Sequence, residues 1–175
     1  MGFGAGQIVY EDDLALFIAR ETYQEITTVS VVASTTLVDV PGSTITVVAG
    51  ATYWLEVWIA YNGPIAGDAK FAWEVSDANI TLDRNILAPA KTINSTASQG
   101  NEQIPDMIMI RRGTTTAEEV GTPAGVVNAY TAYHETAIVK STAASDGTAN
   151  MQFAQAVASG TSLIQSGYMK LTRVA

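Results

Sequence analysis

The sequence predicts an all-β fold: an antiparallel β-sandwich of the jelly-roll kind, with an N-terminal extended arm and one short helix. Three observations lead to this class. Residues 51–62, ATYWLEVWIAYN, alternate with period two, as a central strand does. Similar short segments recur along the chain between Gly, Pro, Asn and Asp turn signals. The length of 175 residues suits one domain, and 47% hydrophobic residues supply a core.

The first 27 residues are predicted to form an arm. Residues 1–6 are glycine-rich, and residues 7–10 can extend. Asp12 or Asp13 can cap a short helix over Leu14–Glu21, whose apolar residues share one stripe. A helix this short is not stable alone, so its stripe must rest on the body or on a neighbouring chain. The candidate docking residues of this arm are Ile8, Tyr10, Leu14, Phe17 and Ile18.

The sandwich domain is predicted over residues 28–175, with a long loop region at 84–126. Within that region only Ile104–Arg112 has the apolar pattern of a strand, and so long a connection is usually functional. The expected strands of the body are Thr28–Val32, Thr35–Val40, Thr44–Val48, Ala51–Asn62, Asp68–Ser76, Asn79–Asp83, Val126–Ser141, Gly147–Ser159 and Tyr168–Val174.

The composition indicates an assembled protein rather than a monomeric cytosolic enzyme. Charged residues make up 15% of the chain, against roughly 25% in ordinary soluble domains. The net charge is −8, and the nine basic residues are scattered, so a nucleic-acid groove is not expected. No apolar run approaches the roughly 20 residues of a membrane span. The absence of cysteine excludes disulfides and thiolate metal sites.

Charged and titratable residues offer no recognisable active site. His134 is the only histidine, and it lies in a strand pattern without a catalytic or metal-binding motif around it. Glu56 and Glu74 could be cross-strand neighbours, as a glycosidase pair would require, but an outward-facing structural role is favoured. The acidic runs at 11–13 and 118–119 lack the spacing of a calcium loop. We therefore expect no catalytic residue, no metal and no cofactor.

Five aromatic residues allow two interpretations. They can pack in the core, which is the favoured interpretation, or they can form a sugar-stacking surface on the sandwich. These residues are Trp54, Trp58, Trp73, Tyr130 and Tyr133.

The end of the chain resembles the carboxy-terminal β-domain of structural proteins from tailed phages that infect actinobacteria. A strand of the L-Q-F/W-A-Q type, here residues 151–155 after Asp146-Gly147-Thr148, is followed by an ending of the G-S-x-L-x-L-x-R type, here within residues 166–175. Tyr168 stands where serine is common. The resemblance covers most of the chain except about residues 84–125, and its other matching stretches are Ala5–Tyr10 with Asp13-Leu14, Ala33–Leu37 before Val40-Pro41, and Gly50–Tyr53 leading to Asp68–Trp73.

This resemblance implies a non-enzymatic virion protein. The leading expectation is a trimeric capsid decoration, or head-fibre, protein that is made in the host cytoplasm and binds the major capsid protein on the capsid exterior through its arm. The alternative is a minor tail or tail-fibre module that binds host surface glycans.

Overall fold

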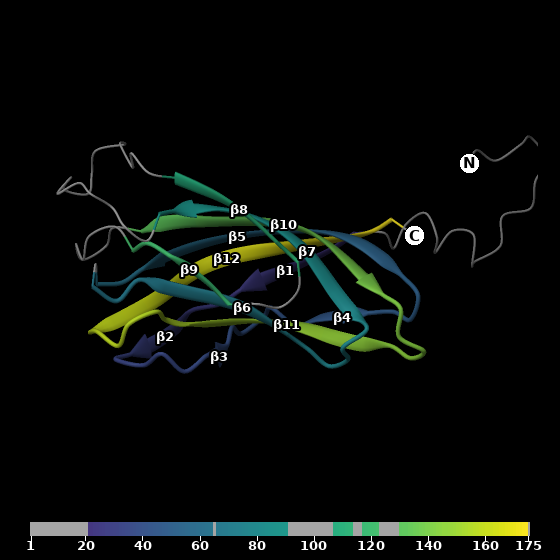
Figure 1. Ribbon diagram of the computed structural model, residues 1–175, viewed down its shortest axis with the longest axis horizontal. Coiled ribbons are helices and arrows are strands. Elements are labelled where there is room, and N and C mark those ends of the chain that lie inside the picture. Colours follow the sequence, from purple (N-terminus) through teal and green to yellow (C-terminus); the bar gives the residue numbers. More distant parts are fainter. Residues whose placement is uncertain (1–20, 65, 91–106, 114–116, 123–129, 175) are drawn as a thin grey trace, which may run out of the picture.

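The structure is a computed structural model that describes residues 21–64, 66–90, 107–113, 117–122 and 130–174, with only the backbone described for 107–113. These ranges contain strands and no helix (Figure 1). The strands are β1 (Glu21–Ile26), β2 (Val29–Val32), β3 (Val38–Asp39), β4 (Ile45–Val47), β5 (Thr52–Asn62), β6 (Ala69–Val75), β7 (Ile80–Pro89), β8 (Met107–Gly113), β9 (Glu118–Val120), β10 (Thr131–Ser141), β11 (Gly147–Gln155) and β12 (Thr161–Arg173).

Two antiparallel sheets pack face to face as a sandwich (Figure 1). The larger, here called sheet A, has the order β1-β12-β5-β10-β7-β8, and β2 also pairs with β12. The smaller, sheet B, has the order β3-β11-β6-β9, and β4 also pairs with β11. The predicted β-sandwich is thus confirmed.

The strand pairs are nested, which is the topology of a jelly roll. Strands β1 and β2 pair with β12, β3 and β4 with β11, β5 with β10, and β6 with β9. The chain is therefore one long hairpin whose successive pairs fall alternately in sheet A and sheet B. The β7–β8 pair is an insertion between β6 and β9 that widens sheet A beyond β10.

The core lies between the sheets and is centred on Phe71 of β6. Its ring lies 4.2 Å from that of Tyr133, 5.2 Å from that of Phe153 and 5.4 Å from that of Tyr61, between centroids. These residues come from both sheets and are fully buried. Burial of each large side chain contributes roughly 1.5–3 kcal/mol, so this cluster holds the two sheets together.

The arm was predicted to end at residue 27, but the sheet begins earlier, at Glu21. Glu21–Ile26, assigned to the arm, form β1 and pair with β12 over residues 167–172. Glu21, the last residue of the predicted helix, is therefore in a strand, since β12 offers its edge to this segment. The rest of that helix lies outside the described residues.

The described part of the predicted 84–126 loop is largely sheet. Strand β7 continues past Asp83 to Pro89 and places Arg84, Ile86 and Ala88 inward. Strand β8 confirms the strand expected at Ile104–Arg112, shifted to residues 107–113. The short β9 then pairs with β6. An inward arginine interrupts the apolar alternation of β7, which is why the pattern indicated an early end.

Candidate functional site: the outer face of sheet A

Sheet A has one face on the core and one outer face, and the outer face carries a row of side chains across five strands. Glu25 of β1 lies opposite Tyr168 of β12, which lies opposite Trp58 of β5. Trp58 lies opposite His134 of β10, and His134 opposite Leu87 of β7. We call these five residues the aromatic row.

Two further rows follow the aromatic row on one side, toward the start of β5. The adjacent row is polar at its centre, with Lys170, Glu56 and Thr136 as cross-strand neighbours. The row beyond it is apolar again, with Trp54 opposite Ile138. The outer face therefore alternates between aromatic and polar rows.

Trp58 and Tyr168 are half-exposed neighbours with nearly parallel rings. Their relative exposures are 37% and 43%. The ring planes differ by 18° and the centroids lie 6.4 Å apart. Carbon atoms in contact lie about 3.5–4 Å apart, so parallel rings at this centroid distance are either laterally offset or separated. The two rings are therefore not in full face-to-face contact.

A β-bulge in β12 is what turns Tyr168 outward. The register shifts between Ile164 and Ser166, which leaves Gln165 as the extra residue. Before the bulge Ser162 and Ile164 face the core, whereas after it Met169 does. One inserted residue thus exchanges the two faces of the strand.

Hydrogen bonds and a glycine hold this bulge. The main-chain carbonyl of Gln165 accepts from Thr28 Oγ1 at 2.9 Å, and its side chain accepts from the Tyr130 hydroxyl at 3.1 Å. Gly167 then lets β12 approach β5 closely, because a Cβ there would lie 2.5 Å from the carbonyl oxygen of Trp58. The position of Tyr168 beside Trp58 is therefore fixed by the backbone.

Two pairs of polar side chains, one of them an ion pair, lie in the polar row and beside it. His134 Nε2 and Glu56 Oε1 are 3.6 Å apart. Lys170 Nζ lies 2.7 Å from Glu21 Oε1 and 5.6 Å from the centroid of the Tyr23 ring. The hydrogen bond from Lys170 lowers the pKa of the Glu21 carboxyl, and the same contact raises the pKa of Lys170. Surface pairs of this kind are screened by water and salt and contribute little to stability.

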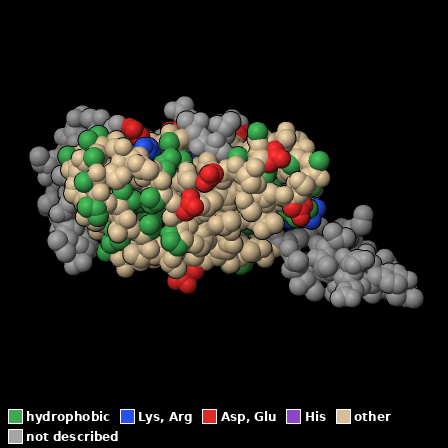
Figure 2. All heavy atoms as spheres, turned by 90° about the horizontal axis from the view of Figure 1, so that it is seen from below, with side chains coloured by type: hydrophobic (Ala, Val, Ile, Leu, Met, Phe, Trp, Pro, Cys, Tyr) green, Lys and Arg blue, Asp and Glu red, His purple; other side chains and the backbone are tan. Residues whose placement is uncertain are grey.

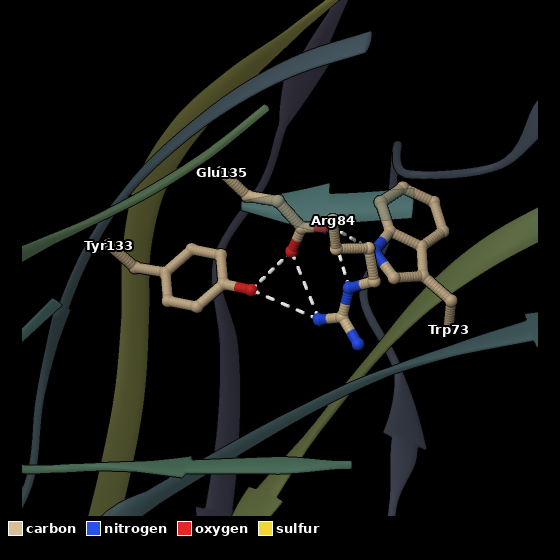
Figure 3. A network of polar contacts seen from close by, with 4 residues as sticks. All are labelled: Trp73, Arg84, Tyr133 and Glu135. Carbon is tan, nitrogen blue, oxygen red and sulfur yellow. Dashed lines mark hydrogen bonds and ion pairs between the residues drawn. The ribbon is translucent and has the colours of Figure 1, made fainter. Parts of the chain in front are cut away.

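Beneath the outer face lies a buried polar network, shown in Figure 3. Arg84 and Glu135 are both fully buried, and Arg84 Nε and Nη2 donate to the two Glu135 oxygens at 2.8 and 3.1 Å. Trp73 Nε1 donates to Glu135 Oε1 at 2.9 Å from sheet B, and the Tyr133 hydroxyl donates to Glu135 Oε2. The network joins β7 and β10 to β6 and so fixes the inserted strand against the sandwich.

Burial and charge perturb the titration of this network. Burial alone would lower the pKa of Arg84, but the Glu135 carboxylate and Tyr133 raise it above its usual value. Burial first, and then the Glu135 charge, raise the pKa of Tyr133 well above its usual value. Burial likewise raises the pKa of Tyr61, which donates to the Gly121 carbonyl at 2.6 Å. These phenols therefore stay protonated in the folded state.

The outer face of sheet B is different in character. Gln152 Nε2 donates to Asp39 at 3.1 Å and to Glu74 at 3.0 Å, so its centre is polar. Figure 2, seen from the side of sheet B, shows acidic groups over the middle and hydrophobic side chains gathered toward the end where β2 and β3 lie. Exposed valines at 32 and 38 belong to those strands.

The candidate docking residues Ile8, Tyr10, Leu14, Phe17 and Ile18 lie outside the described residues. His134 lies on a strand face, as expected.

The possible pairing of Glu56 with Glu74 is wrong. Glu56 is in β5 of sheet A and Glu74 in β6 of sheet B. Both point outward, because Glu56 lies opposite Lys170 of the exposed row and Glu74 hydrogen-bonds on the outer face of sheet B. They lie on opposite sides of the sandwich.

The five aromatic residues divide between the two interpretations. Trp73 and Tyr133 are buried in the core, whereas Trp54, Trp58 and Tyr130 are partly exposed on the outer face of sheet A. Sequence reasoning missed Tyr168 and the Arg84–Glu135 pair. In the alternating pattern of this strand the side chains of Tyr133 and Glu135 fall on the same face. That shared face was the feature of the sequence that could have indicated a buried charge at Glu135.

No group of three or more His, Cys, Asp or Glu is placed to hold a metal ion in the part of the chain that the structure describes. Among the same residues no helix is long and apolar enough to cross a membrane.

Comparisons with known proteins add little. No protein-family model and no curated protein matches the chain. Among solved structures, the VP2 subviral particle of infectious bursal disease virus is 10% identical with a TM-score of 0.23, and the Gt strain of that virus is 9% identical with a TM-score of 0.20. Each match covers 89% of this chain and 41% of the other chain. Such low TM-scores carry no argument about fold or function.

Proposed function

We propose that this chain is a non-enzymatic structural protein of a phage virion, a trimeric capsid decoration protein that binds the major capsid protein on the capsid exterior. The observation that carries the proposal is the nested jelly-roll pairing of the sandwich. Jelly rolls are common among viral capsid domains and lectins, and the sequence resemblance to phage structural proteins favours the first of these.

The arrangement of charged residues supports a role without catalysis. The one buried acid–base pair described, Arg84 with Glu135, is fully enclosed between the sheets and out of reach of a substrate. The exposed carboxylates Glu56 and Glu74 lie on different sheets, so they do not form a glycosidase pair. The low fraction of charged residues, 15%, suits a chain whose surface is partly covered in an assembly.

The arm is proposed to anchor the protein to the shell. Residues 1–20 precede β1, which is the edge strand of sheet A. Burial of the apolar side chains Ile8, Tyr10, Leu14, Phe17 and Ile18 against the capsid would offset the entropy lost when the arm is ordered.

Location on the virion tests the proposal directly. Intact virions are labelled with a gold-conjugated antibody against the purified chain and imaged by electron microscopy, with virions of an unrelated phage as the control. Label spread over the head is the expected result. Label confined to the tail end would favour the alternative, a minor tail or tail-fibre module, and particles without label would overturn both.

Arm anchoring and trimer formation have their own tests. A variant that begins at residue 21 retains β1 and is expected to fold but not to decorate empty shells; a deletion to residue 27 would also remove a paired strand. A full-length variant with serine at the five apolar arm positions is the matched comparison. Full occupancy by either variant would refute anchoring. Sedimentation is expected to give three times the 18.5 kDa chain mass.

A further inference from the structure

We propose that the outer face of sheet A is a binding site for a neutral, β-linked oligosaccharide, with Trp58 and Tyr168 as the stacking platform. This site is independent of where on the virion the protein sits. It would give the protein an adhesive function in addition to its structural one.

The two rings are partly exposed and lie side by side on neighbouring strands whose backbones are fixed. They are nearly parallel with centroids 6.4 Å apart, and each is more than one-third exposed. The negative face of an aromatic ring attracts groups with partial positive charge, and the C–H bonds of a pyranose ring are such groups. Because the bulge and Gly167 fix Tyr168 beside Trp58, little ordering entropy opposes binding.

Polar side chains flank the platform on both sides. Glu25 lies next to Tyr168, and His134 next to Trp58, in the same cross-strand row. Glu56 lies on the same face two residues from Trp58 and 3.6 Å from His134. A few placed polar groups beside an apolar surface are typical of small-molecule sites, and carboxylate and imidazole groups hydrogen-bond readily to sugar hydroxyls.

The charge of this face disfavours an anionic ligand. Its described side chains include the four carboxylates of Glu21, Glu25, Glu56 and Asp83, against the lysines at 140 and 170. The whole chain carries a net charge of −8. A sulfated or phosphate-containing glycan would be repelled.

The alternating rows disfavour a protein partner on this face. A dry interface would have to bury the Glu56–His134 and Glu21–Lys170 pairs, which are now partly exposed, at a desolvation cost. A polyhydroxylated ligand can instead hydrogen-bond to the polar row while it stacks on the aromatic one.

A third aromatic residue extends the platform along the strand. Trp54 precedes Trp58 by four residues on the same face, so at ~3.3 Å per residue their Cα atoms are roughly 13 Å apart. A single sugar cannot reach both rings, but an oligosaccharide can. A β-linked chain of hexoses is extended and presents axial C–H bonds on its faces, which suits exposed aromatic rings spaced along a strand.

The test is titration of the full-length protein with chitohexaose and cellohexaose, followed by tryptophan fluorescence and by the indole N–H signals in NMR spectra. Saturable binding to at least one of these is expected. Maltohexaose, an α-linked comparison, and dextran sulfate, an anionic one, are expected to bind at least tenfold more weakly. No saturation by either β-linked hexasaccharide at millimolar concentration would overturn the proposal.

Matched variants locate the site. Trp58→Ala and Tyr168→Ala are expected to weaken binding at least tenfold while the protein still folds, because both side chains lie on the outer face and not in the core. Val38→Ala removes an apolar side chain of similar exposure from β3 of sheet B and is expected to change affinity less than threefold. Equal losses in all three variants would refute the platform. Sedimentation of Trp58→Ala distinguishes a subunit contact: a lower assembly mass would assign this face to a second copy of the chain instead.

Discussion

Replacement of Arg84 by methionine is expected to destabilise the protein strongly. Arg84 and Glu135 are fully buried and joined by two hydrogen bonds. Without the guanidinium the Glu135 carboxylate keeps only the donors of Trp73 and Tyr133 in this network. Removal of one partner of a buried ion pair costs about 3–5 kcal/mol. For a chain of this length that corresponds to a fall in melting temperature of roughly 6–20 °C.

The assay is equilibrium unfolding in urea, followed by tryptophan fluorescence, since Trp73 itself belongs to the network. Lys140→Met is the matched control, because it removes an exposed basic residue from the same strand pair, and a change within about 0.5 kcal/mol is expected. The double variant Arg84→Met with Glu135→Gln keeps an acceptor for Trp73 and removes the unpaired charge. It is expected to recover about 1–3 kcal/mol of the loss.

Two results would refute this reasoning. If Arg84→Met unfolds within about 1 kcal/mol of the wild type, the guanidinium does not compensate a buried charge. If the double variant is no more stable than the single one, the loss comes from packing rather than from an unpaired carboxylate. In either case the network would not be what fixes β7 against β10.

Three further predictions concern titration, backbone strain and surface charge. Tyr61 and Tyr133 have raised pKa values in the folded state. Their contribution to the free energy of unfolding is therefore complete below pH ~10 and is lost as the pH rises above it, at up to about 1.4 kcal/mol per pH unit for each tyrosine. Urea unfolding from pH 9 to 11 measures this slope, and Tyr133→Phe should reduce the slope by about half. Gly42→Ala should lower the free energy of unfolding by at least about 1–2 kcal/mol, because Gly42 has φ +80° and a Cβ there would lie 2.1 Å from a carbonyl oxygen of β1. An unchanged melting temperature would contradict this turn geometry. Lys170→Met should leave the urea midpoint nearly unchanged, and the small difference should shrink further in 1 M salt. A large, salt-independent loss of stability would count against a surface pair.

The sandwich could be predicted from sequence because its longest strands keep an unbroken period of two. The central strand, expected at 51–62, is β5 at 52–62. Where the alternation breaks, the prediction failed. The buried Arg84 concealed the second half of β7, and the extra residue Gln165 exchanges the faces of β12, so that only the part after the bulge was recognised.

The candidate site was beyond local patterns because it depends on pairing between distant segments. Trp58 and Tyr168 become neighbours through the β5–β12 pairing, which joins the first half of the chain to its end. The same topology explains the wrong pairing of Glu56 with Glu74. Their strands are successive in sequence, but a jelly roll sends successive strands of its long hairpin to opposite sheets.

The nested pairing also constrains how the protein is made. Among the described strands β1 and β2 are made first, yet their partner β12 is made after all the others. Such distant contacts form slowly, and sheet A cannot be completed before β12 has been synthesised. Until then the nascent chain lacks the finished outer face, and Tyr168 cannot yet meet Trp58. Synthesis of β12 therefore sets the earliest moment at which that face can function.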